Sequence, residues 1–305
     1  MAVPRRVIFV LILGVMAASQ SGNLIRIGDA PAVAIAAWRL VLATLLFIPF
    51  AGRGLKTVRF AARRDLVLLV LAGAALAGHF IAWIAAVQHT TVANAAIFFA
   101  MTPVLTAVGG YLFFKERTTF RLVVSILLGL LGVAVLGAAD LSLRPEHVTG
   151  DALAVLSAVL FTAYFLLGKA PRQRVEIEVY VTVLYAVAAL VGIIAMALQG
   201  LPAFDYSGRS WLCFALMALV PTMLGHTSFN YALRYVDTGR IAATTLAEPF
   251  LAGVVAFFVW DEPVGGYAIV GYVLVSASVL VLGFKELRGF TRFLLRLTLW
   301  RNQRN

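Results

Sequence analysis

Ten apolar stretches follow one another along this 305-residue chain, and only short polar connections separate them. A helix of about 20 apolar residues spans the hydrocarbon core of a bilayer. Because 62% of the residues are hydrophobic and only 13% are charged, a soluble domain could not cover this apolar surface. We therefore predict an all-α integral membrane protein with ten transmembrane helices. The expected spans are 7–27, 31–51, 66–87, 91–114, 119–139, 151–170, 179–199, 210–233, 239–260 and 265–284.

The first stretch admits two interpretations. Arg5 and Arg6 precede it and Ala17-Ala18-Ser19 ends it, which is the order of parts in a cleaved signal peptide. Apolar residues continue beyond Ser19, and the second half of the chain contains a counterpart of this segment. We therefore favour an uncleaved first helix.

The basic residues predict the orientation of the chain. Lys and Arg accumulate in cytoplasmic segments of membrane proteins. With the N-terminus placed in the cytoplasm, 21 of the 25 basic residues fall on the cytoplasmic side, Arg39 lies within a helix, and only Arg26, Arg144 and Arg209 fall outside. Both termini are thus expected in the cytoplasm. The net charge of +11 then reflects membrane orientation and does not indicate nucleic-acid binding.

A repeated pattern divides the chain into two halves. Pro103 precedes Glu116 by 13 residues, and Pro249 precedes Glu262 by the same interval. A repeat of five helices is odd in number, so the second copy must be inverted in the membrane, with a central cavity between the copies. We expect the first repeat over 1–140, the inverted repeat over 141–284, and a basic cytoplasmic tail over 285–305 that is either an amphipathic surface helix or disordered.

These features resemble a known family. The duplicated Thr102-Pro103 and Glu248-Pro249, the Gly-rich fifth helix around Gly129 and Gly132, and Arg39 in the second helix are similar to the ten-helix EamA-domain branch of the drug/metabolite transporter superfamily. The resemblance covers about residues 7–284. It implies a secondary carrier in a bacterial inner membrane, often an exporter of amino acids or other metabolites.

Glu248 is the one acidic residue expected deep inside a helix, where ionisable groups are costly and usually functional. It could couple transport to protons, bind a cationic group of the substrate, or form a structural pair with Arg39. We expect Arg39 to be structural, because a long arginine side chain can reach the membrane surface.

Pro103 and Pro249 lack an N–H group and are expected to bend their helices as hinges. Each would also free a carbonyl four residues earlier, at Phe99 and Thr245, and these carbonyls could line a cavity or simply accompany a packing kink.

His79 and His226 occupy matching positions of the two repeats. Counting residues along helices that rise 1.5 Å per residue places them roughly 10 Å apart in depth, too far to share a metal ion. Each is expected to act singly, either on a substrate or in a polar contact between helices.

Further polar and aromatic residues lie within the apolar helices and are candidates for lining the cavity: Gln20, Asn23, Trp83, Asn94, Phe98, Tyr164, Asn230 and Thr245. Glu116 and Glu262 sit at helix ends, which favours a structural or gating role. The chain has no Walker A loop, no G-x-S-x-G elbow and no metal-ligand motif.

Together these patterns favour a non-ATP-driven transporter of a small metabolite, with neither cofactor nor catalytic residues. A lipid flippase or scramblase is an alternative, and a membrane-embedded enzyme a weaker one. The expected partners are a small-molecule substrate, protons and membrane lipids, in a monomer or homodimer.

Overall fold

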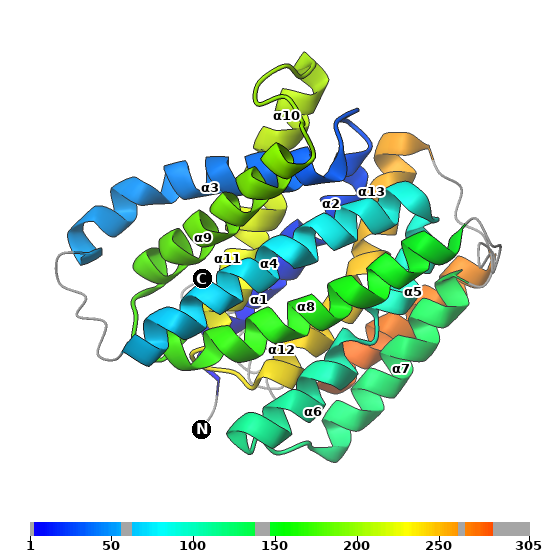
Figure 1. The fold of residues 1–305 in the computed structure, drawn as a ribbon. Coiled ribbons are helices and arrows are strands. Elements are labelled where there is room, and N and C mark those ends of the chain that lie inside the picture. Colours follow the sequence, from blue (N-terminus) through cyan, green and yellow to red (C-terminus); the bar gives the residue numbers. More distant parts are fainter. Residues whose placement is uncertain (1–2, 56–62, 138–146, 262–265, 283–305) are drawn as a thin grey trace, which may run out of the picture.

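The computed structural model describes residues 3–55, 63–137, 147–261 and 266–282, and all regular elements in them are helices. Eight helical segments are long and apolar enough to cross a bilayer, and two shorter apolar helices complete ten, as predicted. The elements are α1 (Arg5–Ala18), α2 (Ser21–Ile25), α3 (Ala32–Leu55), α4 (Arg63–His89), α5 (Val92–Phe99), α6 (Thr102–Phe114), α7 (Phe120–Gly137), α8 (Val148–Arg172), α9 (Ile177–Leu198), α10 (Gly208–Met217), η2 (Ala218–His226), α11 (Thr227–Ala232), α12 (Thr238–Thr244), η3 (Thr245–Ala247), α13 (Glu248–Trp260) and the helix Gly266–Leu282 (Figure 1).

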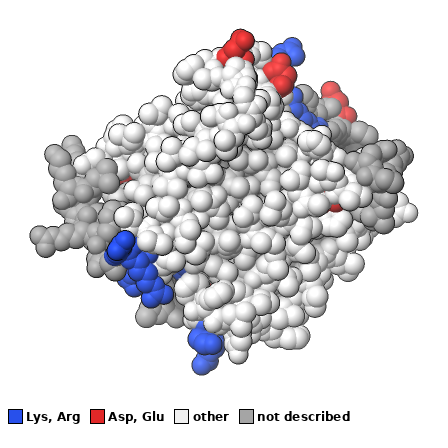
Figure 2. All heavy atoms as spheres, viewed as in Figure 1, with Lys and Arg blue, Asp and Glu red and all other residues white. Residues whose placement is uncertain are grey.

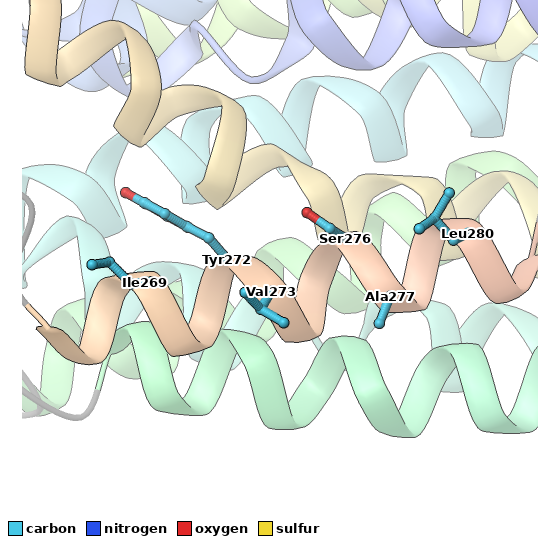
Figure 3. A pocket seen from close by; sticks show the side chains of 6 residues that line it. All are labelled: Ile269, Tyr272, Val273, Ser276, Ala277 and Leu280. Carbon is cyan, nitrogen blue, oxygen red and sulfur yellow. The ribbon is translucent and has the colours of Figure 1, made fainter.

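The outer surface suits a bilayer. Large apolar side chains are exposed along most helices, as at Phe113, Leu198 and Phe258. The face in Figure 2 is almost free of charged side chains across its middle, and the blue and red residues lie toward its edges. The helix Gly266–Leu282 adds an open, mainly apolar groove to this surface (Figure 3). Its lining residues are Ile269, Tyr272, Val273, Ser276, Ala277 and Leu280.

Two ends of the helix bundle can be defined by contacts. The guanidinium of Arg6 lies 5.8 Å from the ring centroid of Tyr235, so α1 begins beside the turn between α11 and α12. We call this end the N-terminal face. At the other end, the Gln88 side chain donates to the Ala30 carbonyl at 3.2 Å, which joins the end of α4 to the start of α3. We call that end the opposite face.

Both predicted proline breaks are present. The fourth span divides into α5 and α6 just before Pro103, and the ninth divides into α12, η3 and α13 just before Pro249. The prediction that the prolines leave two carbonyls without donors is wrong. The Thr102 hydroxyl donates to the Phe99 carbonyl at 2.6 Å, and the backbone N–H of Glu248 donates to the Thr245 carbonyl. A neighbouring hydroxyl and a tightened turn supply the missing donors.

The two halves share an unusual turn. Lys115 and Asp261, which end α6 and α13, are left-handed with φ values of 56° and 52°, and they are the only non-glycine residues with positive φ in the described chain. Each follows its helix-breaking proline by the same number of residues. Because a non-glycine residue rarely adopts this conformation, its recurrence at matched positions supports the internal repeat.

Candidate functional site

A small polar cavity lies between helices of the two halves. Its volume is about 30 Å³, enough for one or two water molecules. Arg39 and His79 line it from the first half, and His226 and Glu248 from the second. The remaining lining residues are Ala18, Ser21, Phe80, Trp83, Phe99 and Phe161. The cavity therefore combines a basic and an acidic side chain with aromatic walls.

Arg39 is a buried cation with neutral partners. Its side chain is 1% exposed, so it does not reach the membrane surface as its sequence position suggested. Its Nε donates to the Thr222 hydroxyl at 2.9 Å, and its guanidinium stacks 3.7 Å from the ring centroid of Phe80. One terminal nitrogen, Nη2, has no hydrogen-bond partner. Among the described residues, no carboxylate lies within ion-pair distance of Arg39.

Glu248 is the acidic side chain of the same cavity. It opens α13, where the helix dipole favours a negative charge. It lines the same cavity as Arg39, yet in the described part of the chain its carboxylate has neither a hydrogen-bond donor nor an ion-pair partner. The structural Arg39–Glu248 pair considered from the sequence is thus not formed in this conformation.

The two histidines meet in the cavity wall. Their ring centroids are 5.8 Å apart, so the predicted separation of roughly 10 Å is wrong. The estimate used the helix positions and ignored the direction of the side chains. α4 and η2 run in opposite directions, and Cα–Cβ bonds lean toward the N-terminus of their own helix. The His79 and His226 side chains therefore lean toward each other.

His79 is held in one orientation. Its Nδ1 lies 3.1 Å from the Ser157 carbonyl and 2.8 Å from the Ser157 hydroxyl. Because a carbonyl only accepts, Nδ1 carries the proton and Nε2 keeps a lone pair. The His226 Nδ1 is buried without a partner. Across the described residues no three metal-binding side chains cluster.

Thr222, which was not among the residues predicted from the sequence, holds the Arg39 side chain at the cavity. It lies in η2, a π-helical segment that contains Pro221. The Thr222 hydroxyl accepts from Arg39 and donates to the Met217 carbonyl at 2.8 Å, while the Tyr185 hydroxyl donates to the Thr222 carbonyl at 3.2 Å. π-Helical segments are often found at functional sites. Pro221 inside an apolar span was the one sequence signal for this irregularity.

Three other predicted residues lie at or near the cavity. Trp83 lines it directly. Tyr164 packs against His226 with ring centroids 6.1 Å apart, and Asn230 donates to the His226 carbonyl at 2.9 Å. Tyr164 and Asn230 therefore form a layer behind His226.

Three predicted residues near α13 make contacts between or within helices and do not line the cavity. The Asn23 amide donates to Gln20 Oε1 at 3.0 Å and to the Ala252 carbonyl at 3.1 Å, which fastens the bend between α1 and α2 to α13. The Thr245 hydroxyl donates to the Ala242 carbonyl at 2.8 Å, within its own helix.

Asn94 and Phe98 lie on α5, also away from the cavity. Asn94 donates to the Asp151 carboxylate at 3.4 Å, near the start of α8. Phe98 packs against a small apolar cluster formed by Ala86, Ala95 and Ala154.

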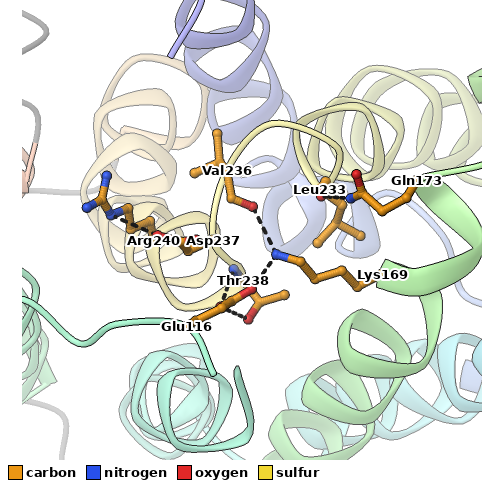
Figure 4. A network of polar contacts seen from close by, with 8 residues as sticks. All are labelled: Glu116, Lys169, Gln173, Leu233, Val236, Asp237, Thr238 and Arg240. Atoms are coloured by element: carbon orange, nitrogen blue, oxygen red, sulfur yellow. Dashed lines mark hydrogen bonds and ion pairs between the residues drawn. The ribbon is translucent and has the colours of Figure 1, made fainter. Parts of the chain in front are cut away.

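A polar network joins the two halves at the N-terminal face (Figure 4). Glu116 Oε2 accepts from the backbone N–H of Thr238 at 2.9 Å and from its hydroxyl at 2.7 Å. Lys169 forms an ion pair with the other oxygen of Glu116 and donates to the Val236 carbonyl. Gly110 makes room for these groups, because a Cβ there would overlap the Glu116 carboxylate. The matching Glu262 lies outside the described residues.

Comparison with known proteins decides the family. The sequence profile of the EamA-like transporter family matches residues 5–138 and again 148–284. The chain belongs to the EamA-like transporter family. This EamA transporter is thus a multi-pass membrane protein from a family of transporters and not of enzymes.

The relatives of this EamA transporter share most of its length. An uncharacterized transporter of Archaeoglobus fulgidus is 29% identical over 80% of this chain and 83% of its own. A probable terminal-alkyne amino-acid exporter of Streptantibioticus cattleyicolor is 24% identical over 92% and 95% of the two chains. One solved crystal structure covers 92% of this chain and 97% of its own, with a TM-score of 0.75 and 19% identity, which shows a shared fold.

Proposed function

We propose that this EamA transporter is a secondary carrier that exports a zwitterionic metabolite, such as an amino acid, from the bacterial cytoplasm by alternating access. Two ionisable side chains at the cavity, neither with a charged partner, carry this proposal. Arg39 lacks an anion and Glu248 lacks a cation within the described residues, although both line one cavity. An isolated charge in the membrane interior is costly. A solute with a carboxylate and an ammonium group would compensate both.

The walls of the cavity favour an apolar or aromatic side chain on the solute. Trp83, Phe99 and Phe161 all line it, and the Trp83 and Phe99 rings are 5.1 Å apart. The His79 Nε2 lone pair can accept a hydrogen bond from an ammonium group. These features fit the Streptantibioticus relative, a probable terminal-alkyne amino-acid exporter.

Alternating access explains the small volume of the cavity. A site of about 30 Å³ cannot hold an amino acid, so the halves must separate before binding. We propose that the Glu116–Thr238 contact holds the N-terminal face closed, and that this face is the cytoplasmic one because basic residues favour it. Substrate sites between inverted repeats are common in secondary transporters.

Counterflow in proteoliposomes tests the proposal. Vesicles loaded with unlabelled phenylalanine should take up labelled phenylalanine or leucine faster than protein-free vesicles. Unlabelled N-acetylphenylalanine lacks the cation and phenylalanine amide lacks the anion, so each should compete at least about tenfold more weakly than phenylalanine, since an unpaired buried charge costs about 2–5 kcal/mol. Equal competition by all three compounds would contradict charge pairing.

Matched substitutions test which cavity side chain binds each charged group of the solute. Arg39→Gln should lose discrimination against phenylalanine amide, and Glu248→Gln should lose discrimination against N-acetylphenylalanine. The controls Arg209→Gln and Glu178→Gln change exposed residues of the same types. A pH gradient gives a separate readout. If Glu248 carries protons instead, Glu248→Gln abolishes gradient-driven flux and leaves the competition order unchanged.

A further inference from the structure

A second buried arginine lies between the cavity and the N-terminal face. Arg172, at the end of α8, is 1% exposed. Its Nε donates to the Asn230 carbonyl at 3.0 Å and its Nη1 to the Val175 carbonyl at 2.8 Å. No described carboxylate lies within ion-pair distance of it. Like Arg39, Arg172 is a cation held by neutral groups.

Arg172 belongs to a polar stripe on α8. Tyr164, Gly168 and Arg172 recur every four residues and so share one face of the helix. The Tyr180 hydroxyl from α9 lies against Gly168, where a Cβ would overlap it. Asn230 from α11 adds its side chain, which donates to the His226 carbonyl. We call these five residues the α8 stripe.

Three polar atoms of the α8 stripe are fully enclosed and make no hydrogen bond of ordinary geometry, although the Asn230 side chain lies beside the Tyr164 hydroxyl. They are the Tyr164 hydroxyl, the Tyr180 hydroxyl and Asn230 Oδ1, and all three residues are completely buried. Buried polar atoms are nearly always satisfied by protein or by water, and each exception needs an explanation. Three such atoms on one stripe mark a place suited to water or a polar ligand.

The α8 stripe leads from the cavity to the polar network. At one end Tyr164 packs against His226, which lines the cavity. At the other end, Lys169 near the end of α8 and Gln173 just after it donate to the carbonyls of Val236 and Leu233 (Figure 4). The stripe therefore ends beside the polar network around Glu116.

We propose that the α8 stripe is the wall of the passage from the N-terminal face to the cavity, and that Arg172 binds the carboxylate of the transported solute there before Arg39 does. The proposal rests on the proposed function only for the identity of the ligand as the transported solute. In the competing interpretation Arg172 is a structural tether of the α11 carbonyl, and its charge has no role.

Thiol labelling separates the two interpretations without measuring transport. In full-length protein with Cys213→Ser, Tyr164→Cys is exposed to two water-soluble methanethiosulfonates, the anionic sulfonatoethyl and the cationic trimethylammonioethyl compounds. We expect both to react, the anionic one faster, and Glu116→Gln to accelerate both. Val159→Cys on the lipid-exposed side of α8 is the control and should not react.

The charge of Arg172 is tested by Arg172→Gln, which retains hydrogen-bond donors. We expect the ratio of anionic to cationic labelling rates to fall at least about fivefold. An unchanged ratio, or a Tyr164→Cys no more reactive than Val159→Cys, would overturn the proposal. Asn230→Cys repeats the measurement if Tyr164→Cys is not monodisperse in detergent. Normal labelling combined with absent counterflow would refute the proposed function and leave the anion-binding passage supported.

Discussion

Glu116 and Thr238 are 122 positions apart in the chain, yet one carboxylate oxygen of Glu116 accepts both the backbone N–H and the hydroxyl of Thr238. Glu116 directly follows the α6 end, and Thr238 begins α12. The first N–H groups of a helix have no partner within the helix, and its N-terminus favours an anion. A carboxylate from one repeat thus caps a helix of the other and joins the two halves at the N-terminal face.

Removing this cap should loosen the N-terminal face. Glu116→Gln replaces charge-assisted hydrogen bonds worth about 1.5–3 kcal/mol by weaker ones. Hydrogen–deuterium exchange of the amides in 239–243 should accelerate by about tenfold or more. Asp237→Asn is the matched control, because it removes only the exposed 3.5 Å pair with Arg240 and should change exchange little. Equal protection in Glu116→Gln and the wild type would show that the contact does not hold this face closed.

Thr222 should matter through its hydroxyl. Thr222→Val removes the acceptor of the Arg39 Nε hydrogen bond at nearly constant volume, whereas Thr222→Ser keeps the hydroxyl. A buried donor left without its partner costs about 1–3 kcal/mol. Concentration-dependent counterflow should therefore show about tenfold weaker apparent affinity in Thr222→Val and near-normal affinity in Thr222→Ser. Similar losses in both variants would point to packing of η2.

His79 can be tested as a hydrogen-bonding group separately from its packing. His79→Phe preserves a ring that can stack on Phe99, whose centroid is 5.6 Å away, but it removes both nitrogens. It also leaves Ser157 without its imidazole partner. We expect roughly tenfold weaker binding of phenylalanine in detergent by isothermal titration calorimetry, since one or two neutral hydrogen bonds are lost. If His79→Phe binds phenylalanine with wild-type affinity, His79 contributes only packing to the site.

Asp29 at the opposite face should give a pH-dependent contribution to stability. Hydrogen bonds from the Ser210 hydroxyl, and next from Ser207, lower the pKa of Asp29 below its ordinary value of 3.8. A carboxylate with a lowered pKa stabilises the fold above its unfolded-state pKa and loses that contribution as pH falls through the folded-state value. The Tm difference between the wild type and Asp29→Asn should be constant from about pH 7 to 5 and shrink below about pH 4. A difference that persists unchanged at about pH 3 would contradict this assignment.

Much of the cavity could be anticipated, because polar residues are rare in apolar helices. That rule selected Glu248, His79 and His226, which line the cavity. The same rule selected Asn23, which instead bonds to the carbonyl of Ala252 in a neighbouring helix. Hydropathy identifies a polar residue inside a span, but it does not show whether that residue faces a cavity or another helix.

Local chemistry in the sequence determined the ten helices, the breaks before Pro103 and Pro249, and the repeat, because apolar length, a missing N–H and matched spacing act within one segment. Only the tertiary structure decided that Arg39 and Glu248 share a cavity without pairing, that His79 meets His226, and that Glu116 caps α12. These relationships depend on which faces of distant helices pack together and on how side chains lean from antiparallel axes. Neither the packing of distant helices nor the resulting side-chain contacts can be derived from the spacing of residues along one helix.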